Sequence, residues 1–318
     1  MEAPVIAIVI PCYNEQQVLP LCLSTIIAEL HQLIEDKIVS NDSYLYVCDD
    51  GSSDNTWDIV KKWNAEGKPV FGLSLNSNCG HQNALYAALM SVRGHCDAAI
   101  TIDADLQDDP KAIREMVLKY NNGAQAVFGV RSDRDSDSWF KRESARAYYS
   151  LQSKLGLDIV PDHADFRLLG SKALDYLSEY HEHNLYLRGI VAQLGLKNDT
   201  VTYRRTNRKA GKAKYTFKKM LLLSADGITS FSSRPIKLIF LIGILLLLLD
   251  IAMSAYVFIS YFGHDVIPGW TSIMLSVWFL GSIILISLGI LGEYIGKIYT
   301  EVKDRPRYHI KDQIKTNI

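Results

Sequence analysis

Two long apolar segments near the C-terminus constrain this chain more than any other feature. Residues 238–262 carry one charged side chain, that of Asp250, and residues 270–292 carry none. Each segment is longer than the roughly 20 residues that a helix needs to cross a bilayer, and soluble core helices are rarely apolar on every side for so long. We therefore predict two transmembrane helices, at about 236–262 and 270–293. A carboxylate near mid-membrane is costly, so Asp250 would face either the bundle interior or a subunit interface.

Basic residues on both sides of these segments predict their orientation. The connector 263–269 has no Lys or Arg, whereas the outer flanks are basic at Arg234, Lys237, Lys297, Lys303, Arg305, Arg307 and Lys311. The positive-inside rule then places both flanks and both termini in the cytoplasm of a multi-pass cell-membrane protein. Residues 216–234 mix lysines with apolar side chains, which is typical of an amphipathic helix on the membrane surface or of a helix packed on the preceding domain. Residues 298–318 are expected to form a cytoplasmic tail.

Residues 1–215 have the pattern of an α/β domain. We expect strands at 5–10, 44–48, 70–75, 98–102 and 126–130, and helices at about 16–36, after Ser53, at about 81–92 and from Pro110. Strands that alternate with helices favour a mostly parallel sheet with helices on both faces. The five cysteines form no CxxC pair, which indicates reduced thiols. The formal net charge of −1 gives no sign of a nucleic-acid partner.

Three polar loops follow three of the expected strands, at Pro11–Glu15, Asp49–Asp54 and Asp103–Asp109. In an open α/β sheet such loops meet in one crevice at the carboxyl ends of the strands. Tyr13 can cover a flat ring there, and Asp49 or Asp50 can accept hydrogen bonds from a base or a ribose. His81, at the entry to a later helix, has either an anion-binding role or a structural one.

Asp103, Asp105 and Gln107 alternate along the third loop, so their side chains share one face if the segment is extended. Carboxylate and amide oxygens suit Mg²⁺ or Mn²⁺ that is also held by substrate phosphates. The alternative is an acidic loop that only caps the helix begun by Pro110.

Cationic side chains gather in two places. Residues 204–219 hold eight Lys or Arg side chains and no acid, just before the apolar segments. Such a run either clamps an anionic ligand through its arginines or binds anionic lipid headgroups. The second group, interspersed with acids, consists of Arg131, Arg134, Lys141, Arg142 and Arg146.

Four motifs together resemble those of family 2 inverting glycosyltransferases with the GT-A fold: Pro11-Cys-Tyr-Asn-Glu15, Asp49-Asp-Gly-Ser-Ser-Asp54, Gly80-His-Gln-Asn83 and Asp103-Ala-Asp-Leu-Gln107. The similarity is greatest to the branch of dolichol-phosphate mannose synthase and the bacterial bactoprenol glucosyltransferases. It implies a Rossmann-like, mostly parallel GT-A domain followed by two transmembrane helices. It also implies inverting transfer of a hexose, glucose or N-acetylglucosamine, from a nucleotide sugar, UDP-linked as in the bacterial members, to undecaprenyl phosphate at the cytoplasmic membrane face.

The resemblance also implies roles for individual residues. The nucleotide-sugar pocket is expected to be lined by Pro11, Tyr13, Glu15, Asp49, Asp50, Asp103, Arg205, Arg208 and Lys214. The divalent cation is expected on Asp103, Asp105 and Gln107. Arg131 and Arg146 are expected to bind the acceptor phosphate for a different reason, because Arg131 ends an expected strand at the catalytic edge. The loop that closes over the donor departs from the family pattern, because Ala213 stands where a serine is usual.

Asp165 completes the catalytic candidates, which also include Asp103, Asp105 and Arg131. It matches an acidic residue near the reacting centre of the family, where it would orient a sugar hydroxyl, stabilise positive charge at the anomeric carbon or contact the metal. The alternatives are an ion pair with Arg167 or a helix cap. An acceptor phosphate has a second pKa of about 6, so it is mostly a dianion at pH 7 and needs no strong general base.

Competing functions are a polysaccharide synthase and a nucleotide-sugar-binding subunit that depends on a partner. A synthase of this fold usually carries a Gln-x-x-Arg-Trp motif and more membrane helices, and the sequence has neither. A Rossmann dehydrogenase is disfavoured because no GxGxxG follows the first strand. The bacterial resemblance is compatible with a homo-oligomer. Because two membrane helices cannot readily flip a lipid-linked sugar, we expect a separate flippase that acts on the product.

Overall fold

The computed structural model describes residues 3–131, 163–183, 185, 187–204 and 269–316, with isolated helical positions between 239 and 252. The expected amphipathic helix and most of the first apolar segment lie outside the described residues. The same holds for Asp250 and for the site candidates Arg146, Arg205, Arg208 and Lys214. The chain divides into two units. One comprises residues 1–150, 158–215 and 305–318, and the other comprises residues 151–157 and 216–304.

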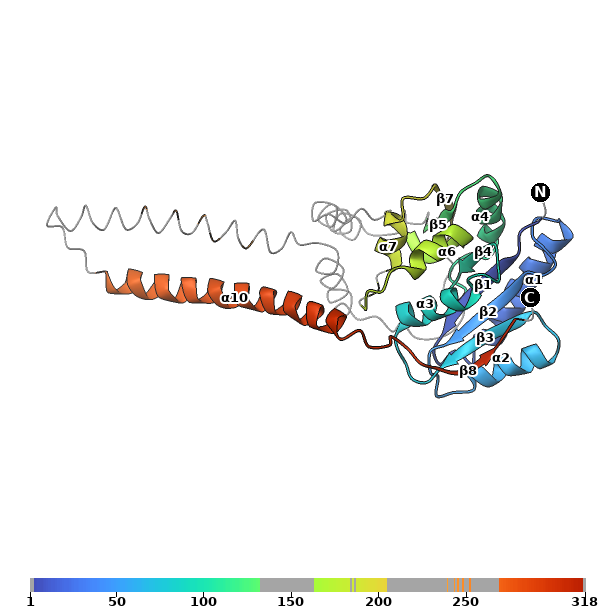
Figure 1. The fold of residues 1–318 in the computed structure, drawn as a ribbon, viewed down its shortest axis with the longest axis horizontal. Helices are drawn as coiled ribbons and strands as arrows, with labels where there is room; N and C mark the ends of the chain where they lie inside the picture. Colours follow the sequence, from blue (N-terminus) through green and yellow to red (C-terminus); the bar gives the residue numbers. More distant parts are fainter. Residues whose placement is uncertain are drawn as a thin grey trace. The chain divides into compact units, whose positions relative to one another are not determined.

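Within the described residues, eight strands of the first unit form one sheet in the order β7-β5-β6-β4-β1-β2-β3-β8 (Figure 1). The strands are β1 (Ile6–Cys12), β2 (Tyr44–Asp49), β3 (Val70–Leu75), β4 (Ala98–Thr101), β5 (Ala126–Arg131), β6 (His163–Gly170), β7 (Asn198–Tyr203) and β8 (Ile310–Ile314). The pairs β1–β2, β1–β4, β2–β3 and β5–β7 are parallel, while β6 runs antiparallel to β4 and β5. The prediction of a mostly parallel α/β sheet is confirmed.

The helices of this unit are α1 (Leu19–Glu35), α2 (Thr56–Ala65), α3 (His81–Val92), α4 (Ala112–Asn121), α6 (Ser171–Ser178) and α7 (Leu187–Gln193). The elements expected between residues 5 and 130 are all present. The largest difference is at α1, which begins at Leu19 and not at residue 16, with Pro20 in its first turn. An earlier start would require Pro20 to donate an amide hydrogen bond that it cannot make.

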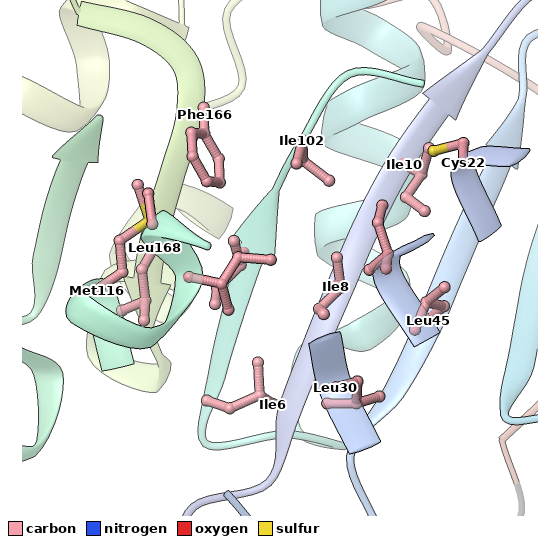
Figure 2. Close-up of a cluster of buried hydrophobic side chains, with 14 of the residues drawn as sticks. Ile6, Ile8, Ile10, Cys22, Leu30, Leu45, Ile102, Met116, Phe166 and Leu168 are labelled. Atoms are coloured by element: carbon pink, nitrogen blue, oxygen red, sulfur yellow. The ribbon is translucent and has the colours of Figure 1, made fainter. Parts of the chain in front are cut away.

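The central strand β1 is buried along its whole length because helices cover both faces of the sheet. Ile6, Ile8 and Ile10 belong to a core cluster with Leu30 of α1 and Met116 of α4 (Figure 2). Alternate residues of the strand point to the opposite face, where α3 packs against β1 and β2. This two-sided cover explains why the strand reads as a continuous apolar run.

The end of the chain differs from the expected tail, because residues 310–314 form the edge strand β8. β8 pairs antiparallel with β3, with Leu73 opposite Gln313. The indole N–H of Trp57, on α2, donates to Asp312 at 2.9 Å, and the side-chain amide of Gln313 donates to the Tyr46 hydroxyl at 3.0 Å. The chain therefore returns to the sheet after its last helix.

Trp57→Phe is expected to loosen β8, because it removes the hydrogen bond to Asp312 while keeping an aromatic ring. A hydrogen bond to a partly exposed carboxylate is worth about 1 kcal/mol, which corresponds to roughly fivefold faster local opening. Hydrogen exchange at the β8 amides of the detergent-purified protein measures this. Trp63→Phe on the same helix is the matched control, since Trp63 stacks with Lys68 instead. Equal exchange in the two variants would contradict the assignment.

The second unit contains α10 (Trp270–Val302), a helix of 33 residues. An 18-residue window within its stretch Phe279–Val302 has a mean hydropathy of 1.8, and α10 is the one helix among the described residues that is long and apolar enough to cross a membrane. At 1.5 Å per residue the helix is about 50 Å long, more than the roughly 30 Å of a hydrocarbon core. The helix predicted at 270–293 is therefore present and longer than expected, while its crossing of a membrane stays a prediction.

Candidate active site

The loops that follow β1, β2 and β4 leave the same edge of the sheet. The parallel register sets Cys12, the last residue of β1, beside Asp49 of β2, and β1 also pairs in parallel with β4. The first two loops are tied together, since the backbone N–H of Asn14 donates to the Ser52 hydroxyl at 2.8 Å. The expected convergence of these loops is thus present in the fold.

Asp49 and Asp50 are buried and hold the loops around the expected nucleotide pocket. Asp49 accepts from the backbone N–H of Ser52 at 3.1 Å and from the Ser74 hydroxyl at 2.7 Å. Asp50 accepts from the backbone N–H groups of residues 79 and 80 at 2.7 and 3.1 Å. Burial raises the pKa of Asp50, although these two hydrogen bonds oppose the shift. Both acids hold these loops in place, and their contact with a base or ribose stays a prediction.

The other nucleotide candidates differ in exposure. Pro11 is buried, Glu15 is partly exposed and the Tyr13 side chain is exposed, so Tyr13 is the one most open to a flat ligand. Gly51 has a φ of +65°, and a Cβ built on it would lie 2.5 Å from the carbonyl carbon of Ser77. Only glycine at position 51 allows the loop after β2 to approach the loop after β3 this closely.

The acidic loop after β4 is not extended, which corrects the geometric assumption of the sequence analysis. Leu106 has a φ of 52°, and the backbone N–H of Gln107 donates to Asp105 at 3.2 Å. Burial nevertheless alternates along the loop. Ala104 and Leu106 are buried, while Asp103, Asp105 and Gln107 are partly exposed. The three expected metal ligands therefore share the accessible side of a turn.

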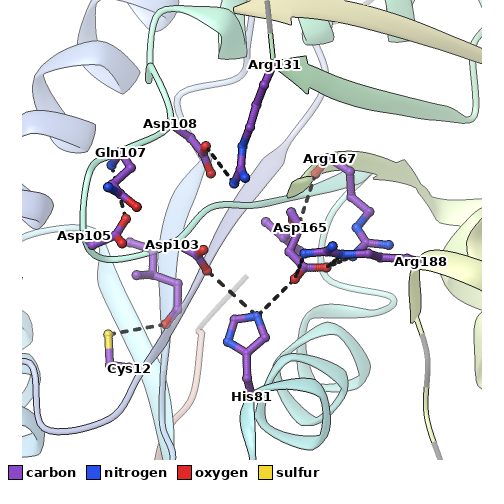
Figure 3. Close-up of polar contacts among 12 residues, drawn as sticks. Cys12, His81, Asp103, Asp105, Gln107, Asp108, Arg131, Asp165, Arg167 and Arg188 are labelled. Carbon is purple, nitrogen blue, oxygen red and sulfur yellow. Dashed lines mark hydrogen bonds and ion pairs between the residues drawn. The ribbon is translucent and has the colours of Figure 1, made fainter. Parts of the chain in front are cut away.

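His81 lies between Asp103 and Asp165 (Figure 3). Its Nε2 atom is 3.9 Å from an oxygen of Asp103 and 3.5 Å from an oxygen of Asp165. Burial opposes the imidazolium form, but Asp165 and Asp103 together raise the pKa of His81 above its usual value. Burial raises the pKa of Asp103 to about 6. The charge of His81 lowers this pKa, and the carboxylate of Asp165 contributes to the rise. His81 thus links the acidic loop to β6.

Asp165, on β6, is surrounded by cations. Arg188 of α7 makes two hydrogen bonds to its carboxylate, at 3.1 Å from Nε and 2.9 Å from Nη2. Arg167, which is fully buried, donates to the same carboxylate. Burial opposes ionisation, but Arg188, His81 and Arg167 together hold the pKa of Asp165 well below its usual range. The Asp165–Arg167 pair considered from the sequence is present, and the structure adds Arg188 and His81 to it.

Arg131 ends β5 near the acidic loop. One of its terminal nitrogens is 3.6 Å from Asp108, and a third of its side chain is exposed (Figure 3). Arg188, with 37% of its side chain exposed, is also close enough to affect the charge state of Arg131. Two partly exposed arginines therefore lie at this edge of the sheet, Arg131 beside Asp108 of the acidic loop and Arg188 beside Asp165.

The donor set suits a divalent cation that shares its coordination with a ligand. The described residues contain no group of three or more His, Cys, Asp or Glu side chains that could hold a metal by themselves. Mg²⁺ in nucleotide sites is instead bound by one or two carboxylates together with phosphates and water. Asp103, with 40% of its side chain exposed, and Asp105 provide such carboxylates.

Sequence reasoning missed Arg188, Asp108 and Tyr203, and left the role of His81 open. Asp108 belongs to the acidic motif, so its type and position were a usable signal. Arg188 and Tyr203 carry no local signal, because they reach the site only through the packing of α7 and β7.

Two family models match the sequence. Residues 7–178 match the family described as Glycosyl transferase family 2, and residues 234–298 match the GtrB C-terminal hairpin. The second match covers both apolar segments that were read from the sequence as membrane helices.

Curated relatives match over nearly the whole chain. The uncharacterized glycosyltransferase YkoT of Bacillus subtilis is 44% identical over 307 residues, which cover 96% of this chain and 91% of that protein. The bactoprenol glucosyl transferase of Shigella phage SfX is 35% identical over 311 residues, which cover 97% and 99%. Among solved structures, glucosyl-3-phosphoglycerate synthase from Mycobacterium tuberculosis is 16% identical with a TM-score of 0.45, covering 71% of this chain and 78% of that one.

Proposed function

We propose, from the premise that this chain belongs to glycosyltransferase family 2, that it transfers a hexose from a nucleotide sugar to undecaprenyl phosphate. Homologues named bactoprenol glucosyl transferase support a polyprenyl-phosphate acceptor. Glucose or N-acetylglucosamine is the proposed sugar, and UDP the proposed nucleotide. The apolar helix α10 and the match to a C-terminal hairpin support a membrane location, with transfer proposed at the cytoplasmic face.

One observation carries this proposal: partly exposed carboxylates and partly exposed arginines lie at the same edge of the sheet. Asp103 and Asp105 would face the donor diphosphate, while Arg131 would face the acceptor phosphate. Sugar transfer to a phosphate brings two anions together, and such an arrangement of charges offsets their repulsion. Arginine is the preferred planar partner for phosphate.

The residues present fit Mg²⁺ or Mn²⁺, which would be held by Asp103, Asp105 and Gln107. When bound, the cation would neutralise negative charge on the leaving nucleoside diphosphate. Arg205, Arg208 and Lys214, outside the described residues, are the proposed partners of that diphosphate on its other side.

The acceptor phosphate is itself the nucleophile. One of its oxygens forms a bond to the anomeric carbon while the bond from that carbon to the diphosphate breaks, so an α-linked donor gives a β-linked product. Because the acceptor is already a dianion at pH 7, no residue has to remove its proton. Asp165, paired with two arginines and His81, would keep these cations in place.

A transfer assay tests the proposal. Purified protein, Mn²⁺ and undecaprenyl phosphate are mixed with a panel of radiolabelled UDP- and GDP-sugars, with and without EDTA. We expect butanol-extractable label from one donor, lost with EDTA, in a β-linked lipid phosphate. Label in a long polysaccharide would favour the synthase, and donor binding without transfer would favour a subunit that depends on a partner. An α-linked product would overturn the inverting mechanism.

A further inference from the structure

A buried chain of hydrogen bonds reaches Arg131 from two other elements. Nε of Arg131 is the donor to the Tyr203 hydroxyl at 3.4 Å, and that hydroxyl donates to Asp108 at 2.6 Å. Asp108 and Tyr203 are 2% and 5% exposed, whereas a third of the Arg131 side chain is exposed. Asp108 and Tyr203, at the inner end of this hydrogen-bond chain, are therefore enclosed by protein. Arg131, at its outer end, is a cation open to a ligand.

The Tyr203 ring is held in one place by its surroundings. The parallel register sets Tyr203 beside Arg131, and the ring packs edge-on against Phe166 with centroids 5.3 Å apart. Gly129 leaves room for the ring, because a Cβ at that position would lie 2.9 Å from its Cε1 atom. The hydroxyl that contacts Arg131 is thus fixed by packing as well as by Asp108.

Charge gives Asp108 a second effect on the same guanidinium. Burial and the nearby Arg188 disfavour the charged form of Arg131, while Asp108 and Tyr203 favour that form. A buried carboxylate therefore offsets the repulsion between two arginines at one edge of the sheet. Without it, Arg131 would be expected to turn away from Arg188.

We infer that Asp108 and Tyr203 are positioning residues that hold the guanidinium of Arg131 where the acceptor phosphate binds. This inference rests on the proposed function and deepens it. The contacts to Tyr203 and Asp108 involve Nε and one terminal nitrogen of Arg131, so they set the plane of the guanidinium. Phosphate binding gains affinity when the planar donor is oriented beforehand, since less freedom is lost on binding.

The test measures KM for each substrate separately in Tyr203→Phe. Losing the hydrogen bond to Arg131 is expected to raise KM for undecaprenyl phosphate about tenfold and to leave KM for the nucleotide sugar unchanged. In an Arg131→Ala background the same change is expected to add no further loss, because Tyr203 would act only through Arg131. Tyr120→Phe is the matched control, since Tyr120 donates to the backbone carbonyl of Asp97 on another part of the domain.

Each outcome separates this inference from the proposed function. Additive losses in the double variant, equal changes in both KM values or an unchanged acceptor KM would overturn the positioning role. If the unmodified protein transfers no sugar to a lipid, the proposed function fails, and binding of undecaprenyl phosphate in detergent micelles becomes the readout. Weaker binding in Tyr203→Phe than in Tyr120→Phe would then still support the inference, and equal binding would reject it.

Discussion

Asp103→Asn is expected to reduce the rate of sugar transfer by roughly 10³-fold while leaving the folded protein as stable as before. Removing one group that stabilises charge in a reacting site costs about 10² to 10³ in rate, and Asp103 is proposed to act through a cation that carries two charges. Stability should not fall, because burial together with the carboxylates of Asp165, Asp108 and Asp105 outweighs the attraction of His81 and raises the pKa of Asp103, so the fold disfavours its charged form. The acid is thus placed for function at a cost to the fold.

Thermal unfolding with and without Mn²⁺ and nucleotide checks this prediction independently of activity. The unmodified protein should gain stability when both are added, since anything that binds only the folded state stabilises it, and Asp103→Asn should not. Asp109→Asn is the matched control, because Asp109 belongs to the same loop but accepts from the backbone N–H of Lys111. A loss of stability in Asp103→Asn, or a rate within tenfold of the original, would contradict the assigned role.

Asp165→Asn, unlike Asp103→Asn, is expected to lower the stability of the folded protein, and it should also abolish most activity. The carboxylate is 10% exposed and is paired with Arg167, which is 1% exposed, and with Arg188. Removing one partner from a buried ion pair leaves an uncompensated charge, which costs about 3 kcal/mol. Activity should fall as well, because Arg188 and His81 lose the group that orients them.

Denaturant unfolding of the detergent-purified protein measures the predicted loss. Asp199→Asn provides the control, since Asp199 forms an exposed ion pair with Lys119 at 3.0 Å and exposed pairs contribute little. No measurable change is expected in the control. Equal stability of Asp165→Asn and the unmodified protein would mean that both arginines find other partners, and the proposed orienting role would fail.

The order of strands and helices up to residue 131 was predictable because it follows from local patterns. The apolar run at residues 5–10 and the helical spacing within 19–34 describe neighbours along the chain, and both elements formed as expected. The acidic loop was predictable for the same reason. Its shape was not, because the positive φ of Leu106 depends on packing that alternation of residue types does not reveal.

The sequence by itself determined the succession of elements up to residue 131, the long apolar C-terminal helix and the three polar loops at one edge of the sheet. Only the tertiary structure decided which distant residues meet there. Arg188 reaches Asp165 from 23 positions away, Tyr203 reaches Asp108 from 95, and Trp57 reaches Asp312 from 255. Periodicity and hydrophobicity report on near neighbours in the chain, whereas these contacts depend on which strands and helices lie side by side in the folded sheet. The residue type of a single arginine or tyrosine does not indicate which distant strand or helix it will contact.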